Sequence, residues 1–441
     1  MSSGSSIIKP TDPGYEKAVF AYDLHPQTPA AACVPTTVAE VQEAIGWARE
    51  NGLTVAAQST GHRAVGLPPL DDSLLIRPMI NTEPVIDAKE RIARVGAGTT
   101  WDSVVNAAAE HGLAAMHGSS PTVGVVGYTV GGGLSFYGRE HGLACNKVRA
   151  IEVVTGEGEV ARVDADHEPD LFWALRGAGG WASVVTAIEF ELLPYREIFG
   201  GASFWPVEAS DAVLSTWLDW TRSAPESVTT SFRIMNMPPI EEVPEPIRGQ
   251  NLVAIDGVAT DQGDGQALVA QLDGIAEPLM AQWGQMPAPA ASRLHGDPED
   301  PVPAIGAGGM VDGLDEEAVA AFVEAAGGES GSALLAAELR QLGGQLRRPD
   351  DSGGVADHID AEFVSFGVGM AADPAGAAKT QEDLGRLMGA LEPWAGKHRF
   401  LNFSNPDSSC QQCFGDDSTE ALKAIRHEYD PDGLIVPPIA L

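Results

Sequence analysis

The chain has 441 residues, which is enough for two domains that each bury a hydrophobic core. Its 62 acidic and 27 basic residues give a formal net charge of −35, and such a field repels nucleic acid and anionic lipid. No apolar run approaches the roughly 20 residues that cross a bilayer, and the N-terminus lacks the pattern of a signal peptide. We therefore expect no nucleic-acid or membrane partner and a cytoplasmic location.

The acidic residues are spread along the whole chain. This pattern is typical both of an ordinary acidic enzyme and of a protein adapted to high salt, because an acidic surface stays soluble when screening is strong. Composition does not choose between the two, and it does not predict the oligomeric state.

The 4 cysteines are too few for a disulfide framework. Cys410 and Cys413 have the spacing of a redox pair or of half a metal site. No second pair completes a zinc site, so we predict a loop that carries two free thiols. No other metal-ligand pattern is present, and we predict no metal site.

The first 200 residues alternate between strand-like and helix-like stretches. Residues 1–32 hold several prolines and are expected to be irregular, and Thr37 and Glu40 form a capping box that begins a helix ending near Gly52. Further helices are predicted from Thr100 to Gly112 and over 170–176. The predicted strands are 53–57, 73–78, 91–95, a hairpin of 147–155 with 159–164, and 183–193.

Beyond residue 198 the predicted strands are 204–207, 230–235, 251–259 and 361–369, with helices over 268–280, 316–325 and 381–391. This favours an antiparallel sheet that helices cover on one face. We predict an α+β fold with a first domain over 1–197, a second over 198–395, and a segment over 396–441 that returns to the first domain.

The turn Gln58-Ser59-Thr60-Gly61-His62 follows a short apolar strand. A turn of small residues can bring backbone N–H groups close to a phosphate, although an ordinary surface turn would read the same way. The run 118–138 is built almost entirely of small and β-branched residues. We interpret it as backbone lying against a flat, extended ligand rather than as an amphipathic helix or an ordinary strand, with close backbone packing as the alternative.

These stretches resemble a known family. The residues from Gln58 to Gly66 are similar to the diphosphate loop of the berberine bridge enzyme-like flavoproteins, which belong to the vanillyl-alcohol oxidase superfamily. Residues 121–124 and 131–133 resemble that family's second flavin loop, and 429–435 resemble its C-terminal signature. The amino-acid sequence of the second loop is similar to that of bacterial, 6-hydroxy-D-nicotine oxidase-like members.

The resemblance implies a PCMH-type FAD-binding domain and a separate substrate domain. It implies that FAD is attached covalently through His62. A cysteine that gives many relatives a second tether is replaced by Ser120, so a single tether is expected. The cofactor-binding residues that we expect are Gln58, Ser59, Thr60, Gly61, His62, Gly118, Ser119, Thr122, Val123, Gly124, Gly127, Tyr128, Gly132, Gly133, Val185 and Asn402.

The resemblance further implies an oxidoreductase that takes hydride from a C–H bond beside oxygen or nitrogen of a small organic substrate. Val123 matches a position where valine accompanies oxidases and leucine accompanies dehydrogenases, which favours O2 as the electron acceptor. A dehydrogenase with another acceptor, and a flavin-bound protein that performs no redox chemistry, stay open as alternatives.

The catalytic base is not determined by the sequence. Relatives often have an Asn-Tyr pair near the C-terminus, but here Phe403 follows Asn402 and cannot take a proton. Tyr128, Tyr137 and His141 are the candidates that we name, each with a structural hydrogen bond as the alternative role. We interpret His295 as a loop residue.

Overall fold

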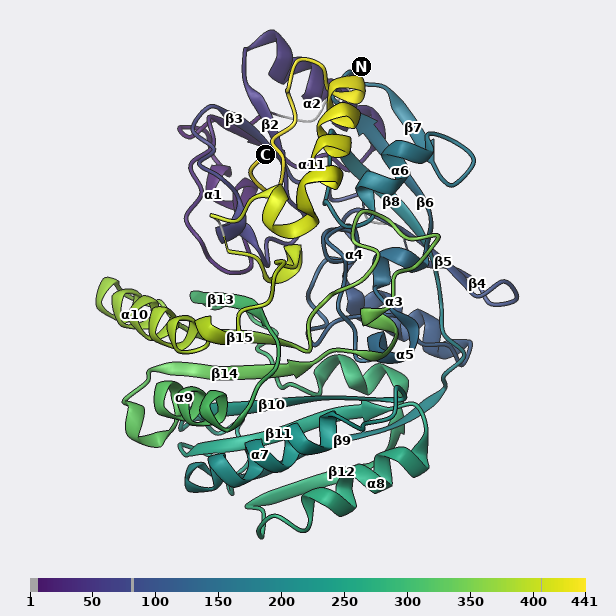
Figure 1. Ribbon diagram of the computed structural model, residues 1–441. Coiled ribbons are helices and arrows are strands. Elements are labelled where there is room, and N and C mark those ends of the chain that lie inside the picture. The colour runs from purple at the N-terminus through teal and green to yellow at the C-terminus, as the bar shows by residue number, and fades with distance from the viewer. Residues whose placement is uncertain (1–6, 81–82, 406) are drawn as a thin grey trace.

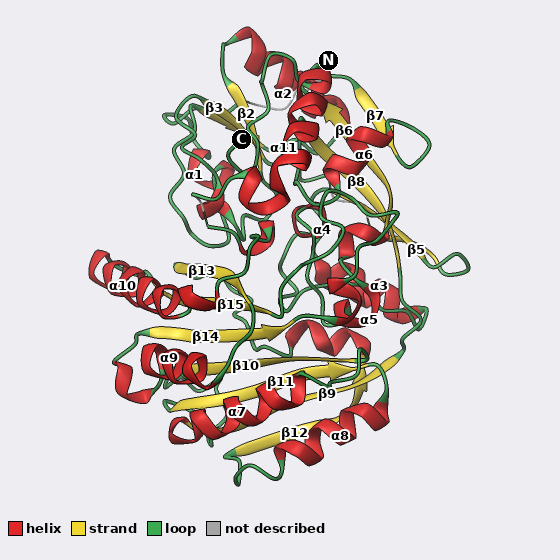
Figure 2. Cartoon of the chain, viewed as in Figure 1, coloured by secondary structure: helices red, strands yellow, loops and turns green. Residues whose placement is uncertain are grey.

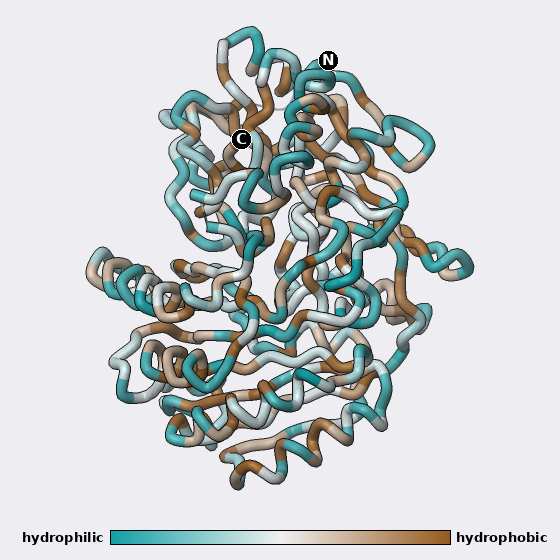
Figure 3. Tube along the Cα trace, in the orientation of Figure 1, coloured by the Kyte–Doolittle hydropathy of each residue, from teal (hydrophilic) through white to brown (hydrophobic). Residues whose placement is uncertain are grey.

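The computed structural model describes residues 7–80, 83–405 and 407–441. Three β-sheets lie in two parts, and both chain ends belong to the upper part in Figure 1. The most hydrophobic stretches run through the interior of both parts, and hydrophilic stretches follow the outer loops and helices (Figure 3). None of the described helices combines the length and the apolar character that a membrane span requires.

The first sheet has three parallel strands in the order β1-β3-β2, which are β1 (Ala31–Cys33), β2 (Thr54–Ala57) and β3 (Ser73–Ile76). Helix α2 (Val38–Glu50) joins β1 to β2. The predicted capping box is confirmed, since the Thr37 side chain accepts from Glu40 N while the Glu40 carboxylate accepts from Thr37 N. The helix buries its apolar stripe and thereby directs β2 into the turn at Gln58.

The second sheet has five antiparallel strands in the order β4-β5-β8-β6-β7. Its core contains Trp101 and Trp181, both almost fully buried. The predicted hairpin is confirmed as β6 with β7. The elements of this part are β4 (Val85–Asp87), β5 (Ile92–Gly96), β6 (Val148–Thr155), β7 (Val160–Val163), β8 (Ser183–Glu191), and helices α1 (Tyr15–Ala18), α3 (Trp101–Glu110), α4 (Val125–Val130), α5 (Gly138–His141) and α6 (Pro169–Leu175).

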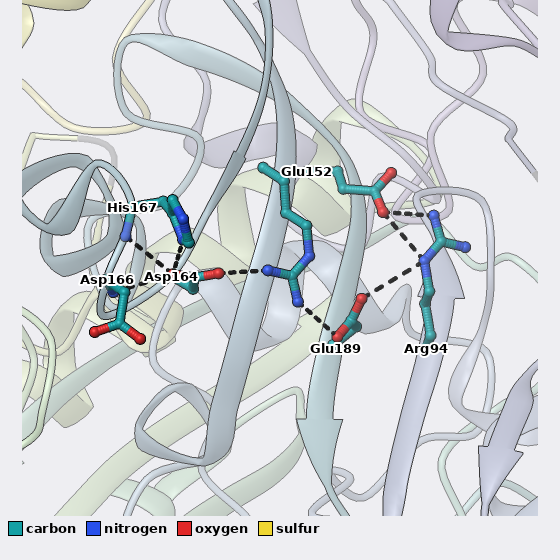
Figure 4. Close-up of polar contacts among 7 residues, drawn as sticks. Arg94, Glu152, Asp164, Asp166, His167 and Glu189 are labelled. Atoms are coloured by element: carbon teal, nitrogen blue, oxygen red, sulfur yellow. Dashed lines mark hydrogen bonds and ion pairs between the residues drawn. The ribbon is translucent and has the colours of Figure 1, made fainter.

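A row of ion pairs crosses one face of the five-stranded sheet. Arg94 of β5 contacts Glu152 of β6 at 2.6 Å and Glu189 of β8 at 3.8 Å (Figure 4). Arg162 of β7 contacts the same Glu189 at 3.0 Å from the other side. All four side chains are partly exposed, so each pair contributes at most about 1 kcal/mol. The row of ion pairs therefore contributes little to the stability of the fold.

The third sheet has seven antiparallel strands in the order β12-β9-β11-β10-β14-β15-β13, with helices on one face (Figure 2). These helices and the strands share a second core around Trp205 and Trp217. The elements are β9 (Glu197–Pro206), β10 (Val228–Asn236), β11 (Asn251–Ala259), β12 (Met280–Pro287), β13 (Ala304–Val311), β14 (Leu334–Gln341), β15 (Phe363–Met370), α7 (Ser210–Thr221), α8 (Gln262–Leu272), α9 (Glu316–Ala326) and α10 (Pro374–Ala390).

The α+β fold, with a sheet covered by helices on one face, is confirmed, and several element predictions are corrected. The helix predicted over 268–280 ends at Leu272, and Met280 already begins a strand. The run 118–138 contains helix α4, although we expected no helix there. A 3-10 helix, Leu401–Phe403, replaces the strand expected at 400–401.

The C-terminal segment packs against the upper part. Helix α11 (Cys410–Tyr429) contains both cysteines that we expected in a loop, and both thiols are buried with no disulfide. The Asp430 carboxylate accepts from the backbone N–H groups of Leu434 and Ile435, and Ile435 pairs with Val55 beside β2. The end of the chain therefore supports the strand that leads into the turn at Gln58, while the exact domain boundaries stay predictions.

Candidate functional site

A cavity of 460 Å³ lies where the two parts meet. The upper part contributes residues 57–64, most of 118–131 and several of 179–185, and the lower part contributes side chains of β10, β14 and β15. Leu401, Asn402, Phe403 and Pro438 line it from the C-terminal segment. The predicted site residues Gln58–His62, Gly118, Ser119, Val123, Gly124, Gly127, Tyr128, Val185 and Asn402 all lie on its wall.

The turn from Ser59 to His62 presents unpaired backbone donors to this cavity. No described residue accepts a hydrogen bond from the N–H groups of residues 59–62. Gly61 has φ +79°, and a Cβ there would lie 2.7 Å from Ala21 Cα, so the turn requires glycine. The buried Arg77 donates to Ser59 O at 3.3 Å and puts a positive charge behind the turn. Unpaired N–H groups with a nearby cation suit an anionic group such as a diphosphate.

His62 is held on one face and on one ring nitrogen. Its ring stacks on Tyr22 with 3.7 Å between centroids and 14° between planes. Its Nε2 lies 3.1 Å from Thr122 Oγ1. Burial lowers the pKa of His62 to about 4, so the imidazole is neutral at neutral pH. No described residue forms a hydrogen bond with Nδ1, which leaves that nitrogen for a reaction partner.

The glycine-rich run lies against the first turn and leaves room beside it. Gly124 N donates to Thr60 Oγ1 at 3.2 Å, which joins the two loops. No described atom lies within 4 Å of a Cβ built at Gly127, so a side chain there would extend into free space at the cavity wall. The glycines therefore open the cavity at this point, as expected for backbone beside a flat ligand.

Three predicted cofactor residues are not on the cavity wall. Thr122 contacts the wall residue His62 through its hydroxyl group. Gly132 packs against Phe400, and Gly133 packs against Tyr128 and Ala144. Gly133 N donates to Asn402 Oδ1 at 2.8 Å, so this glycine positions a wall residue instead of lining the wall. For these three residues, a role in binding FAD therefore stays a prediction.

The structure places only one of the three candidate bases at the cavity. Tyr128 lines it, and the buried Tyr128 hydroxyl has no hydrogen-bond partner in the described chain. Burial raises the pKa of Tyr128 well above its ordinary value, so the phenol is neutral. Tyr137 is buried against His117 and Tyr195, and His141 lies 2.9 Å from the Tyr195 hydroxyl. Tyr137 and His141 lie outside the cavity wall, and a catalytic role for either stays a prediction.

Sequence reasoning missed a buried charged group on the sheet face that lies toward the upper part. We call Arg233, Asp256, His295, Glu338 and Arg340 the charged wall. Arg233 pairs with Asp256, and Arg340 binds Glu338 through Nε at 2.7 Å and Nη2 at 3.2 Å. All but Asp256 line the cavity. The two guanidinium groups of the wall are thus each paired with a carboxylate.

His295 is buried, at 6% exposure, and is not the plain loop residue that we expected. Its Nε2 lies 3.1 Å from Asp256 Oδ1, and its Nδ1 lies 3.5 Å from Arg340 Nη2. Arginine can only donate, so Nδ1 is an acceptor in this arrangement and Nε2 carries the proton. The imidazole is thereby held between Asp256 and Arg340 at the cavity wall.

One sequence signal for the charged wall was available. In β14, the residues Ala336, Glu338 and Arg340 alternate with apolar ones and so share one face of a strand. Charged residues inside an otherwise apolar strand are a sign of a buried polar site. Phe366 and Phe403 lie beside them on the cavity wall, and the Arg340 guanidinium lies 5.5 Å from the Phe403 ring centroid. No described residues form a cluster that could hold a metal ion.

Comparison with known proteins agrees with this geometry. The FAD binding domain family matches residues 29–164. (R)-6-hydroxynicotine oxidase of Paenarthrobacter nicotinovorans is 32% identical over 224 residues, which are 50% of this chain and 49% of that protein. At the level of sequence, the match thus spans about half the length of this curated relative.

Solved structures match over nearly the whole chain. The berberine bridge enzyme-like protein 1 of Physcomitrella patens superposes with a TM-score of 0.85 at 20% identity, covering 99% of this chain and 96% of that one. The 6-hydroxy-D-nicotine oxidase of Arthrobacter nicotinovorans gives a TM-score of 0.83 at 22% identity, covering 98% and 97%. The chain therefore carries an FAD binding domain at residues 29–164 and shares the fold of these berberine bridge enzyme-like and nicotine oxidase structures.

Proposed function

We propose that the protein is an FAD-dependent oxidase that acts on a small organic substrate. The observation that carries the proposal is the set of unpaired N–H groups at residues 59–62, opening on a cavity that continues to the charged wall. When bound, FAD accepts a hydride at N5 from a C–H bond beside oxygen or nitrogen and passes the electrons to O2. The similarity to a nicotine oxidase supports this class of reaction.

The residues present fit FAD in two respects. The turn at Ser59–His62, with Arg77 behind it, supplies N–H donors and positive charge for a diphosphate. Gly127, Val185 and Asn402 supply a wall on which a flat ring system can lie, since space is free beside Gly127. The same cavity then brings the substrate to the charged wall and to the rings of Phe366 and Phe403.

We propose a covalent link from FAD to His62. The imidazole is neutral and its Nδ1 is open, which are the properties that a nucleophilic nitrogen needs. Ser120 lies on the cavity wall, and its hydroxyl is 3.1 Å from Thr122 Oγ1. A hydroxyl at this position is a far weaker nucleophile than a thiolate, so the link through His62 is the only tether in the proposal.

The polar end of the cavity suits a substrate of no net charge. Because the guanidinium and carboxylate groups of the charged wall already pair with each other, a neutral substrate adds no further charge to this partly desolvated site. A neutral molecule that offers both hydrogen-bond donors and acceptors can pair with the free edges of Arg340 and Glu338. Alcohols, sugar hydroxyls and neutral amines meet this condition and share the C–H chemistry proposed above.

The link between FAD and His62 gives the test of the proposal. The purified protein is expected to be yellow, and after acid precipitation the flavin should stay in the pellet. His62→Ala should release all of its flavin into the supernatant. His111→Ala, which changes a histidine at the end of α3 and away from the cavity wall, is the control and should retain the colour. A colourless protein that takes up no FAD would refute the function, and release of flavin by the unaltered protein would refute the tether.

A further inference from the structure

Residues Ala21 to Asp23 run alongside the turn that presents His62. Tyr22 N donates to Thr60 O at 2.9 Å, and Asp23 N donates to Gly61 O at 3.3 Å. The Asp23 carboxylate accepts from Val65 N at 3.1 Å, on the far side of the turn. The N-terminal segment is thus hydrogen-bonded to the backbone on both sides of His62.

The Tyr22 side chain covers the imidazole itself. A separation of 3.7 Å with 14° between planes is a close parallel stack, which fixes the plane of the His62 ring. The Thr122 hydroxyl, 3.1 Å from Nε2, fixes the rotation of the ring within that plane. Together the two contacts determine where Nδ1 points, and neither residue occupies Nδ1.

The Tyr22 hydroxyl is anchored in the lower part of the molecule. It donates to the backbone carbonyl of Pro298, and the carbonyl of Asp300 lies 3.1 Å away. The same loop contributes Asp297 to the cavity wall, where its carboxylate accepts from Ser119 Oγ at 3.0 Å. One aromatic ring therefore connects the turn of the FAD binding domain to the loop of residues 297–300.

We propose that Tyr22 is a positioning residue for the attachment of FAD to His62, and this inference rests on the proposed covalent link. By holding the ring plane, Tyr22 keeps Nδ1 aimed at the 8α-methyl group, so that the reactive geometry is present before the bond forms. Overall, one hydrogen leaves the methyl group and one leaves the imidazole as the Nδ1–carbon bond forms. O2 takes both hydrogens with two electrons and becomes hydrogen peroxide.

The experiment follows attachment in time and does not use turnover. The protein is produced in a riboflavin auxotroph deprived of riboflavin and is then given FAD in air. The covalent fraction is read as flavin fluorescence of the denatured band on a gel, and total bound FAD is read by absorbance after desalting. Tyr22→Phe keeps the ring and should attach FAD within about threefold of the wild-type rate. Tyr22→Leu removes the ring and should slow attachment at least tenfold while still binding FAD.

Two further variants keep the result unambiguous. Tyr22→Gln removes the ring but keeps a donor for the Pro298 carbonyl, and it should be as slow as Tyr22→Leu. Tyr15→Leu removes a tyrosine of the same N-terminal segment, whose hydroxyl bonds Pro29 O away from His62, and it should match the wild type. Wild-type rates in both Tyr22→Leu and Tyr22→Gln would overturn the role of Tyr22. Wild-type protein that binds FAD and never links it would overturn the tether as well, and failure to bind FAD would overturn the proposed function.

Discussion

Val123 is the wall residue on which the choice of electron acceptor depends in our proposal. It lies on the cavity wall between the turn at Ser59 and the open space at Gly127. A leucine would add one methylene to this wall, and in our proposal this narrows the space through which O2 reaches the ring. A change of a single side chain here therefore tests the oxidase assignment without altering the diphosphate turn.

We predict that Val123→Leu slows reoxidation of the reduced flavin by air about tenfold, with little change in bound FAD. The measurement is stopped-flow absorbance after reduction with dithionite and mixing with aerated buffer. Val126→Leu, which adds the same methylene to another wall residue, is the control and should reoxidise at the wild-type rate. Equal rates in Val123→Leu and wild type would remove the reason to prefer an oxidase to a dehydrogenase.

At the scale of residues, the sequence predicted a turn at Gln58–His62, and this turn lines the cavity, while its role in binding a diphosphate stays a prediction. The signal for this turn is local in the sequence, because the turn needs small side chains and a glycine at Gly61, and these residues are adjacent in the chain. The charged wall was missed because its partners come from different strands. His295 joins the site through its contacts with Asp256 on β11 and Arg340 on β14. These residues are far apart in the sequence, so no local pattern predicts the contacts.

Among the elements, strand β11 carries a fully buried carboxylate, that of Asp256. Asp256 has no exposed surface, and it pairs with Arg233 on the neighbouring strand β10 and with His295. Burial alone would raise the pKa of this carboxyl, but Arg233 and His295 outweigh it and lower the pKa to about 2. The folded protein thus prefers the charged form of Asp256 more strongly than the unfolded chain does.

We predict that Asp256→Asn lowers the free energy of unfolding by about 3–5 kcal/mol, since it leaves Arg233 buried without a counter-charge. Because the folded pKa lies below the ordinary value, the stabilisation by Asp256 is present above about pH 4 and is lost as the pH falls toward 2. Urea titrations across that range should show a smaller acid loss in Asp256→Asn than in the wild type.

Asp219→Asn breaks the exposed pair with Arg222 and is the control. Its unfolding midpoint should stay at the wild-type value, because exposed ion pairs contribute little. If Asp256→Asn also kept the wild-type midpoint, the pair would contribute nothing measurable and our account of the wall would be wrong.

The elements that we did not predict from the sequence have a local composition that is unusual for a strand or a helix. Strand β13 contains Gly306, Gly308 and Gly309, and isolated glycines normally argue against a strand. It forms because it pairs with β15 along its length. Helix α11 is interrupted at Gly415, which has φ +76°, and its first turns are polar. Both elements form because of strand pairing and packing with distant parts of the chain, so the periodicity of hydrophobic residues within one stretch could not predict them.

Over the whole molecule, the dominant electrostatic fact is the net charge of −35. Like charges spread over one surface repel each other and favour the expanded chain. Salt shortens the Debye length from about 30 Å at 0.01 M to about 3 Å at 1 M, which suppresses the repulsion between exposed carboxylates. Screening should therefore stabilise this protein more than it would a protein of balanced charge.

We predict that the Tm at pH 7.5 rises by several degrees, on the order of 1 kcal/mol or more of stability, between 0.01 M and 1 M NaCl. Differential scanning calorimetry measures it. At about pH 4.5, where many carboxylates take up protons, the same salt series should change the Tm much less. A Tm at pH 7.5 that is flat or falls with salt would show that charge repulsion does not limit stability.

The two ends of the chain meet at the cavity, and this has a consequence for biosynthesis. Tyr22 near the beginning stacks on the wall residue His62, and Asn402, Phe403 and Pro438 near the end line the same space. While residues 401–438 are still inside the ribosomal exit tunnel, that border is incomplete. A cofactor can therefore be enclosed only after this segment has left the tunnel, late in the synthesis of this part of the chain.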